Sequence, residues 1–100
     1  MLIGRVNLST VQKRIFRINY PWLRDGETVV SAVPTVEPND GLFTVSDLII
    51  GVDGDYVQFK ASGNGVVEGG SEYTVSVVVD TSDGQTNDDC LEYQIEDCCP

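Results

Sequence analysis

The chain has 100 residues and a net charge of −10 at pH 7, from sixteen acidic and six basic side chains, and this length suits one domain. The acidic balance argues against nucleic acid or an anionic membrane surface as a partner, because both repel an acidic protein. The sequence contains no histidine, which excludes Ser-His-Asp and Cys-His nucleophile systems and zinc sites built on imidazole.

Residues 1–12 alternate weakly between apolar and polar side chains. They are compatible with an edge strand, a swapped arm or a flexible tail, and we favour an arm that orders on a partner. The sequence shows no run that is apolar enough for a transmembrane span or a signal peptide, so we expect synthesis in the cytoplasm.

The basic side chains are concentrated at the start of the chain. Residues 1–24 hold five of the six basic side chains and no acid, a charge of +5, whereas the remaining 76 residues carry −15. The plainer interpretation is that they line one strand and its solvated arm. The sharper hypothesis is a basic arm that docks on an acidic neighbour, for example another copy of this chain. It assigns partner binding to Arg5, Lys13, Arg14 and Arg17.

The first clear strand is predicted at residues 14–20, where apolar and polar side chains alternate. Pro21 ends this strand. Trp22 should then act as an aromatic plug, and the glycine of the following turn is Gly26. We expect both residues to have structural roles.

The middle of the chain predicts three more strands, at residues 28–36, 42–50 and 56–61. Because Pro34 cannot donate to a β-ladder, its strand should lie at a sheet edge or carry a bulge there. Clusters of glycine, proline, asparagine and aspartate mark the loops between these elements. The loops are expected at residues 37–41, 51–55 and 62–71.

The last part of the chain predicts one β-hairpin within residues 69–96. Apolar side chains recur at every second position of its strands, at Tyr73, Val75, Val77 and Val79 and again at Leu91, Tyr93 and Ile95. Both sets face the same side only if the loop has three or five residues, which pairs Tyr73 with Tyr93. Gly84 should then have a positive φ in a bulged turn.

Six or seven strands separated by turn residues predict an all-β fold, an Ig-like antiparallel β-sandwich. We expect an N-terminal arm at residues 1–12, the sandwich at 13–97 and a C-terminal tail at 98–100. Tyr73 follows a glycine-rich loop at the place of a tyrosine corner, and an ordinary core tyrosine explains it equally well.

Four short stretches carry a resemblance to a known family: residues 22–29 (WLRDGETV), 59–63 (FKASG), 73–77 (YTVSV) and 81–84 (TSDG). In this order they resemble the small immunoglobulin-like proteins of tailed bacteriophages known as fibre-tail adaptors. The resemblance implies a virion structural protein that joins tail or neck to fibres and works as a symmetric oligomer.

The sequence offers few groups for catalysis or cofactor binding, and we expect no enzyme activity and no cofactor. Cys90, Cys98 and Cys99 are an odd set whose spacing suits neither a disulfide nor a zinc knuckle, so reduced thiols are expected. The C-terminal cysteines also depart from the family pattern. Loop-bound calcium stays open, although no glycine has the spacing of an EF-hand. Its candidate ligands are Asp53, Asp55, Asp83, Asp88 and Asp89.

These observations favour a non-enzymatic bacteriophage virion protein, an adaptor that joins tail or neck to fibres through oligomeric contacts. Its expected location is the virion, and its expected partners are other virion structural proteins and further copies of itself, with no nucleic acid and no membrane. One alternative is a capsid decoration protein. Another is a carbohydrate-binding module. Its exposed aromatic platform would have to come from Trp22, Phe43 and Tyr56, because the other aromatic side chains fall mostly at inward positions.

Overall fold

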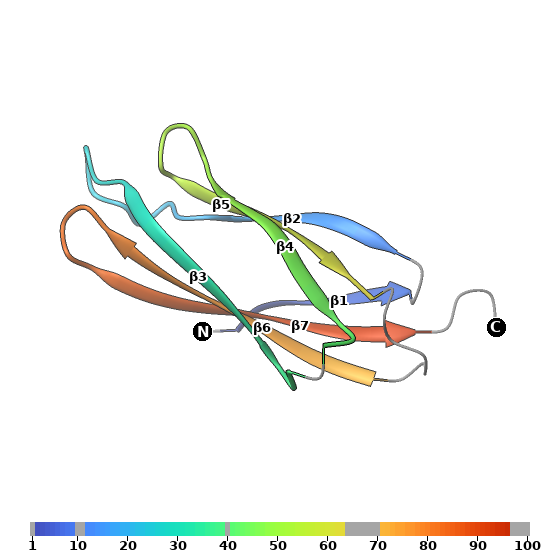
Figure 1. The fold of residues 1–100 in the computed structure, drawn as a ribbon. Coiled ribbons are helices and arrows are strands. Elements are labelled where there is room, and N and C mark those ends of the chain that lie inside the picture. Colours follow the sequence, from blue (N-terminus) through green and yellow to red (C-terminus); the bar gives the residue numbers. More distant parts are fainter. Residues whose placement is uncertain (1, 10–11, 40, 64–70, 97–100) are drawn as a thin grey trace.

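The structure is a computed structural model that describes residues 2–9, 12–39, 41–63 and 71–96 (Figure 1). Within these ranges the chain forms seven strands and no helix, which confirms the all-β prediction. The strands are β1 (Leu2–Ser9), β2 (Lys13–Asn19), β3 (Val29–Glu37), β4 (Thr44–Ile50), β5 (Tyr56–Ser62), β6 (Ser71–Thr81) and β7 (Thr86–Glu96).

The strands form two sheets that pack face to face as a sandwich (Figure 1). One sheet has four strands in the order β1-β7-β6-β3, and the other has three in the order β2-β5-β4. All neighbouring strands are antiparallel except β1 and β7, which are parallel. The predicted sandwich is therefore confirmed.

The alternation of apolar and polar side chains gives the positions in the sequence of the strands before the hairpin. The four strands predicted before the hairpin correspond to β2, β3, β4 and β5, and their ends are shifted by at most two residues. Residues 64–70 of the predicted loop at 62–71 lie outside the described residues. The predicted tail at 98–100 also lies outside them.

The hairpin of β6 and β7 has the predicted register. Tyr73 pairs with Tyr93. The backbone N–H of Thr81 donates to the carbonyl oxygen of Gln85 at 2.9 Å, which closes a three-residue loop. Gly84 in this loop has a φ of +83°, in the left-handed region that glycine adopts without strain. The requirement that both apolar sets face the core is thus enough to select this pairing.

β3 is the edge strand of the four-stranded sheet next to β6. Pro34 lies opposite Val77 in this pair, and the register shifts between Val29 and Ser31. The edge position predicted from Pro34 is confirmed, since a residue without an N–H is tolerated where one side of the strand has no partner.

β1 is the other edge strand of this sheet, at the start of the chain. Its Leu8 lies beside Ile95 of β7 and is buried, with 1% of its surface exposed. The sequence left three alternatives for this segment, an edge strand, a swapped arm or a flexible tail, and in the structure it is an edge strand. It pairs with β7 of the same chain rather than ordering on a partner.

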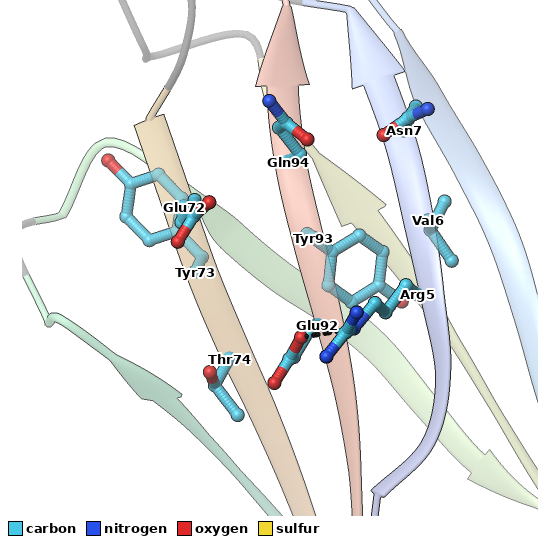
Figure 2. Close-up of a pocket in the computed structure, with 9 residues that line it drawn as sticks. All are labelled: Arg5, Val6, Asn7, Glu72, Tyr73, Thr74, Glu92, Tyr93 and Gln94. Carbon is cyan, nitrogen blue, oxygen red and sulfur yellow. Dashed lines mark hydrogen bonds and ion pairs between the residues drawn. The ribbon is translucent and has the colours of Figure 1, made fainter.

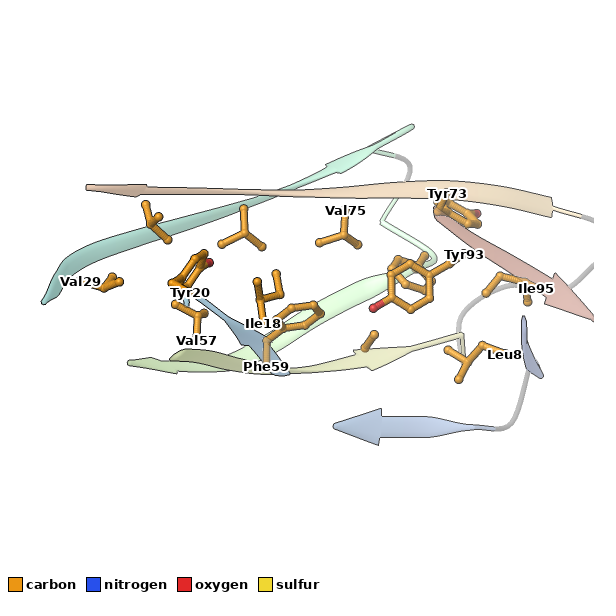
Figure 3. Close-up of a cluster of buried hydrophobic side chains, with 14 residues drawn as sticks. Leu8, Ile18, Tyr20, Val29, Val57, Phe59, Tyr73, Val75, Tyr93 and Ile95 are labelled. Carbon is orange, nitrogen blue, oxygen red and sulfur yellow. The ribbon is translucent and has the colours of Figure 1, made fainter. Parts of the chain in front are cut away.

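The hydrophobic core fills the space between the two sheets (Figure 3). Phe16 connects the sheets, because its ring centroid lies 6.0 Å from that of Phe59 on β5 and 5.2 Å from that of Tyr93 on β7. Such aromatic pairs stabilise a core beyond the area that they bury. The buried apolar side chains are Leu8, Ile18, Tyr20, Val29, Phe43, Val57, Phe59, Ala61, Tyr73, Val75, Val77, Val79, Tyr93 and Ile95.

Candidate interaction surfaces

The two broad outer faces of the sandwich differ in charge. On the four-stranded sheet, side chains that alternate with the buried ones point away from the core, and we call this surface the acidic face. Within the described residues it has six acidic side chains and one basic side chain, a net charge of −5. They are Glu37, Glu72, Asp80, Asp88, Glu92 and Glu96, with Arg5.

The acidic face contains a hollow of about 400 Å³ over β1, β6 and β7 (Figure 2). Arg5 and Glu92 form an ion pair in it, with Nε of Arg5 2.8 Å from Oε2 of Glu92. Glu72 lies on the neighbouring strand β6. An exposed pair of this kind contributes about 0–1 kcal/mol, so its charges can exchange partners at little cost.

The three-stranded sheet has the opposite character, and we call its outer surface the basic face. Lys13 and Arg17 project from β2, and Lys60 projects from β5. Asp47 of β4 is the acid of this face, with Oδ2 3.1 Å from Nζ of Lys60. The net charge of these four side chains is +2. Two exposed isoleucines lie among them, Ile15 (58% exposed) and Ile49 (49% exposed).

Arg17 is held in place at the surface of the basic face. Its guanidinium carbon lies over the ring of Tyr56, 4.0 Å from the centroid, and its Nη2 donates to Oε1 of Gln58 at 3.2 Å. Gly51 makes room for the ring, because a Cβ there would lie 2.2 Å from Cε1 of Tyr56. A cation fixed in this way loses less conformational entropy when a partner binds it.

The structure separates the four residues that were assigned to partner binding. Lys13 and Arg17 lie together on the basic face, whereas Arg5 lies on the acidic face. Arg14 lies opposite Ala61, on the side of β2 that faces the other sheet, but its side chain is exposed. Its guanidinium carbon lies 5.7 Å from the centroid of the Phe16 ring. Sequence reasoning missed Lys60, which joins the basic face only through the pairing of β2 with β5.

The four residues expected to have structural roles lie in the core and in turns. The ring of Tyr73 is buried and stacks on Phe43, with 4.9 Å between the centroids. Its role as a tyrosine corner stays a prediction. Gly26 and Gly84 have positive φ values of 79° and 83°. Trp22 is 40% exposed.

Trp22 packs with the edge of its ring against the buried Tyr20, 5.8 Å between centroids. A second groove of about 470 Å³ beside it is lined by Trp22, Ile3 and the buried Asp89, among others. Burial and the nearby charge of Asp89 raise the pKa of Tyr20 to about 12. Trp22 is therefore a partly exposed cover over Tyr20 rather than a fully buried plug.

Glu27 is a buried carboxylate that sequence reasoning missed. The backbone N–H of Arg24 donates to its Oε1 at 2.9 Å, the hydroxyl of Thr81 donates to its Oε2, and the amide of Gln85 donates to both oxygens. The N–H of Arg24 and the hydroxyl of Thr81 are the main reasons why the pKa of Glu27 lies below its ordinary value. The donors on the β6–β7 turn are 54 and 58 residues away in sequence, which leaves no local signal.

Replacing Glu27 with glutamine is expected to lower the melting temperature by several degrees at pH 7 and by less at pH 3. Since the folded pKa is depressed, the stability from this carboxylate is fully present above the unfolded pKa of about 4.3 and is lost as pH falls through the folded pKa. Thermal unfolding followed by circular dichroism measures the difference. Asp53→Asn, in an exposed loop, is the control that should leave the melting temperature unchanged. A difference for Glu27→Gln that is equal at both pH values would contradict the prediction.

The remaining features of the described residues concern metal binding, thiols and membrane-spanning helices. No group of three or more acidic or cysteine side chains among them could hold a metal ion. Cys90 is free, with its sulfur 3.4 Å from the hydroxyl oxygen of Ser76. Cys98 and Cys99 lie outside the described residues. The described strands and loops include no helix with the length and hydropathy needed to cross a membrane.

The aromatic platform considered for carbohydrate binding does not have the three expected members. Phe43 is 3% exposed and packs between Tyr73 and Tyr93, so the expectation that it is a surface residue is wrong. It lies just before β4 and two residues before Val45, which also packs against the core, so the alternation of the predicted strand at 42–50 already gave its inward direction. Tyr56 has one ring face under the guanidinium of Arg17, which leaves Trp22 as the more exposed member of the set.

Comparison with known proteins agrees with the resemblance seen in the sequence. Residues 11–94 match the family described as podophage GP4 fiber-tail adaptor protein gp77. The matched region includes β2 to β6 and most of β7, and β1 precedes it. No curated protein sequence matches the chain at a significant level. Because the match covers well over half of the residues, the chain belongs to this family of phage fibre-tail adaptor proteins.

Proposed function

We propose that the chain is a non-enzymatic structural protein of a bacteriophage virion, an adaptor that joins the tail to its fibres. It is made in the host cytoplasm and works through contacts with other virion proteins and with further copies of itself. The family match over residues 11–94 is the observation that carries this proposal. The acidic and basic faces support it, since each offers a broad surface for protein contacts.

Within this proposal, the basic face binds a partner through Lys13, Arg17 and Lys60. Arg17 has the central role, because it is positioned by Tyr56 and lies on the same strand as the exposed Ile15, two residues away. Arginine and tyrosine are the residue types that most often dominate the energy of protein interfaces. Arg14 adds a further positive charge beside this face.

The test is deletion of the gene from the phage that encodes this chain, followed by electron microscopy of the particles. The expected particles have tails without fibres, and the wild-type chain supplied from a plasmid restores the fibres. Val52→Ala, at a loop residue that is 99% exposed, should restore them equally well. Particles that keep their fibres after deletion would contradict the adaptor role. A labelled chain found on the capsid shell would favour a decoration protein instead.

A further inference from the structure

We propose that copies of this chain bind one another face to face, with the basic face of one copy on the acidic face of the next. The proposal rests on the adaptor function in one respect: it assumes that an adaptor works as an assembly of several copies. It replaces the docking arm expected from the sequence, because β1 is already paired with β7 of its own chain. It assigns the contact to the two outer faces of the sandwich.

Charge is the first argument for this contact. The acidic face has a net charge of −5 and the basic face has +2, and they lie on opposite sides of one domain. The chain as a whole repels its copies at long range, with a net charge of −10. At physiological ionic strength, however, the Debye length is about 8 Å, which is shorter than the roughly 10 Å between packed sheets. Each face therefore acts mainly through its own charges.

Shape and apolar surface are the second argument. Ile15 and Ile49 project from the basic face, while the acidic face offers Val33 (58% exposed) beside Val78 and also the hollow of about 400 Å³. Glu72 and Glu92 line this hollow, so a cationic side chain that enters it meets carboxylates. Exposed apolar side chains beside complementary charges are typical of protein interfaces.

The dimensions of the domain allow a contact of ordinary size. The molecule measures 48 × 21 × 20 Å, so each broad face has an area on the order of 1,000 Å². A standard interface buries about 800 Å² on each partner. Because the two faces in contact are different, the interface is heterologous, and its repetition gives a ring if the rotation closes and a filament if it does not. Closed rings of three or more copies are built from contacts of this type.

Two variants, each with one altered face, test the proposal by sedimentation velocity and equilibrium from about 10 μM to 1 mM. Ile15→Ser/Arg17→Ser removes the central charge and apolar contact of the basic face. Glu72→Lys/Glu92→Lys reverses the charge in the hollow of the acidic face. The wild-type chain is expected to associate in this range, and each variant alone should associate at least tenfold more weakly. Asp53→Lys/Asp55→Lys changes the total charge as much as the second variant does, but at an end loop, and should associate like the wild type.

Mixing the two altered variants gives the sharpest readout. The intact acidic face of the first should bind the intact basic face of the second, so the mixture forms a 1:1 dimer and nothing larger. Raising the salt to 1 M, where the Debye length is about 3 Å, should weaken this dimer. Circular dichroism verifies that each variant is folded. A wild-type chain that stays monomeric at 1 mM would overturn the proposal, as would a variant that dimerises alone as tightly as the wild type, since that indicates a contact that does not use the altered face. Either result leaves the adaptor role to the test on phage particles.

Discussion

Replacing Phe59 with alanine is expected to lower the free energy of unfolding by about 3–5 kcal/mol. Phe59 is fully buried in the middle of β5, between strands β2 and β4, and its ring contacts that of Phe16. Truncation removes apolar surface from the core and leaves a cavity that packed sheets fill only in part. A domain of this size is stable by about 5–15 kcal/mol, so the variant should lose a large part of its stability.

Urea unfolding followed by the fluorescence of Trp22, the single tryptophan, measures this loss. Ile15→Ala is the matched control, because Ile15 is an apolar side chain of the adjacent strand β2 that faces solvent. Its effect should stay within about 0.5 kcal/mol, as for most surface substitutions. Similar losses for Phe59 and Ile15 would show that the two sides of this sheet had been assigned wrongly.

Replacing Leu8 with alanine is expected to cost about 2–5 kcal/mol of unfolding free energy. Leu8 comes from the segment that the sequence treats as an arm, yet it is as buried as the centre of the core and lies beside Ile95. If the first strand were only loosely attached, its side chains would be solvated in the folded state and the substitution would cost little. The same urea unfolding experiment distinguishes these cases.

Leu2→Ala provides the comparison on the same strand, since Leu2 is 45% exposed. It should change the free energy of unfolding by less than about 0.5 kcal/mol. Amide hydrogen exchange gives an independent readout, because the N–H groups of β1 that bond to β7 should be protected from exchange. Rapid exchange along β1, together with a small effect of Leu8→Ala, would contradict the docked strand.

Local pattern was sufficient for most of the sandwich. Alternating side chains locate β2 to β7, and the pairing of Tyr73 with Tyr93 follows from the requirement that one side of the hairpin is apolar. Pro34 indicates the edge position of β3, since a missing N–H restricts where its strand can pair. In each case the chemistry that decides the structure lies within one strand or one hairpin.

The parts that could not be predicted depend on neighbours that are distant in the sequence. The parallel pairing of β1 with β7 has no connecting turn to set its register, so weak alternation alone suggested a loose arm. The basic face combines Lys60 with residues of β2 that lie far from it along the chain. Glu27 is buried because donors on the β6–β7 turn reach it. Net charge by segment therefore located the basic residues but could not show which face of the sandwich each of them occupies.

The central place of β7 in its sheet has a consequence for synthesis. β7 is the hydrogen-bonded neighbour of both β1 and β6, so the four-stranded layer cannot form until translation has passed residue 96. A product that stops before residue 86 leaves β1 without a neighbour and lacks Glu92 and Gln94 from the hollow. Unfinished chains therefore lack the complete acidic face, one of the two surfaces through which we propose that copies bind one another.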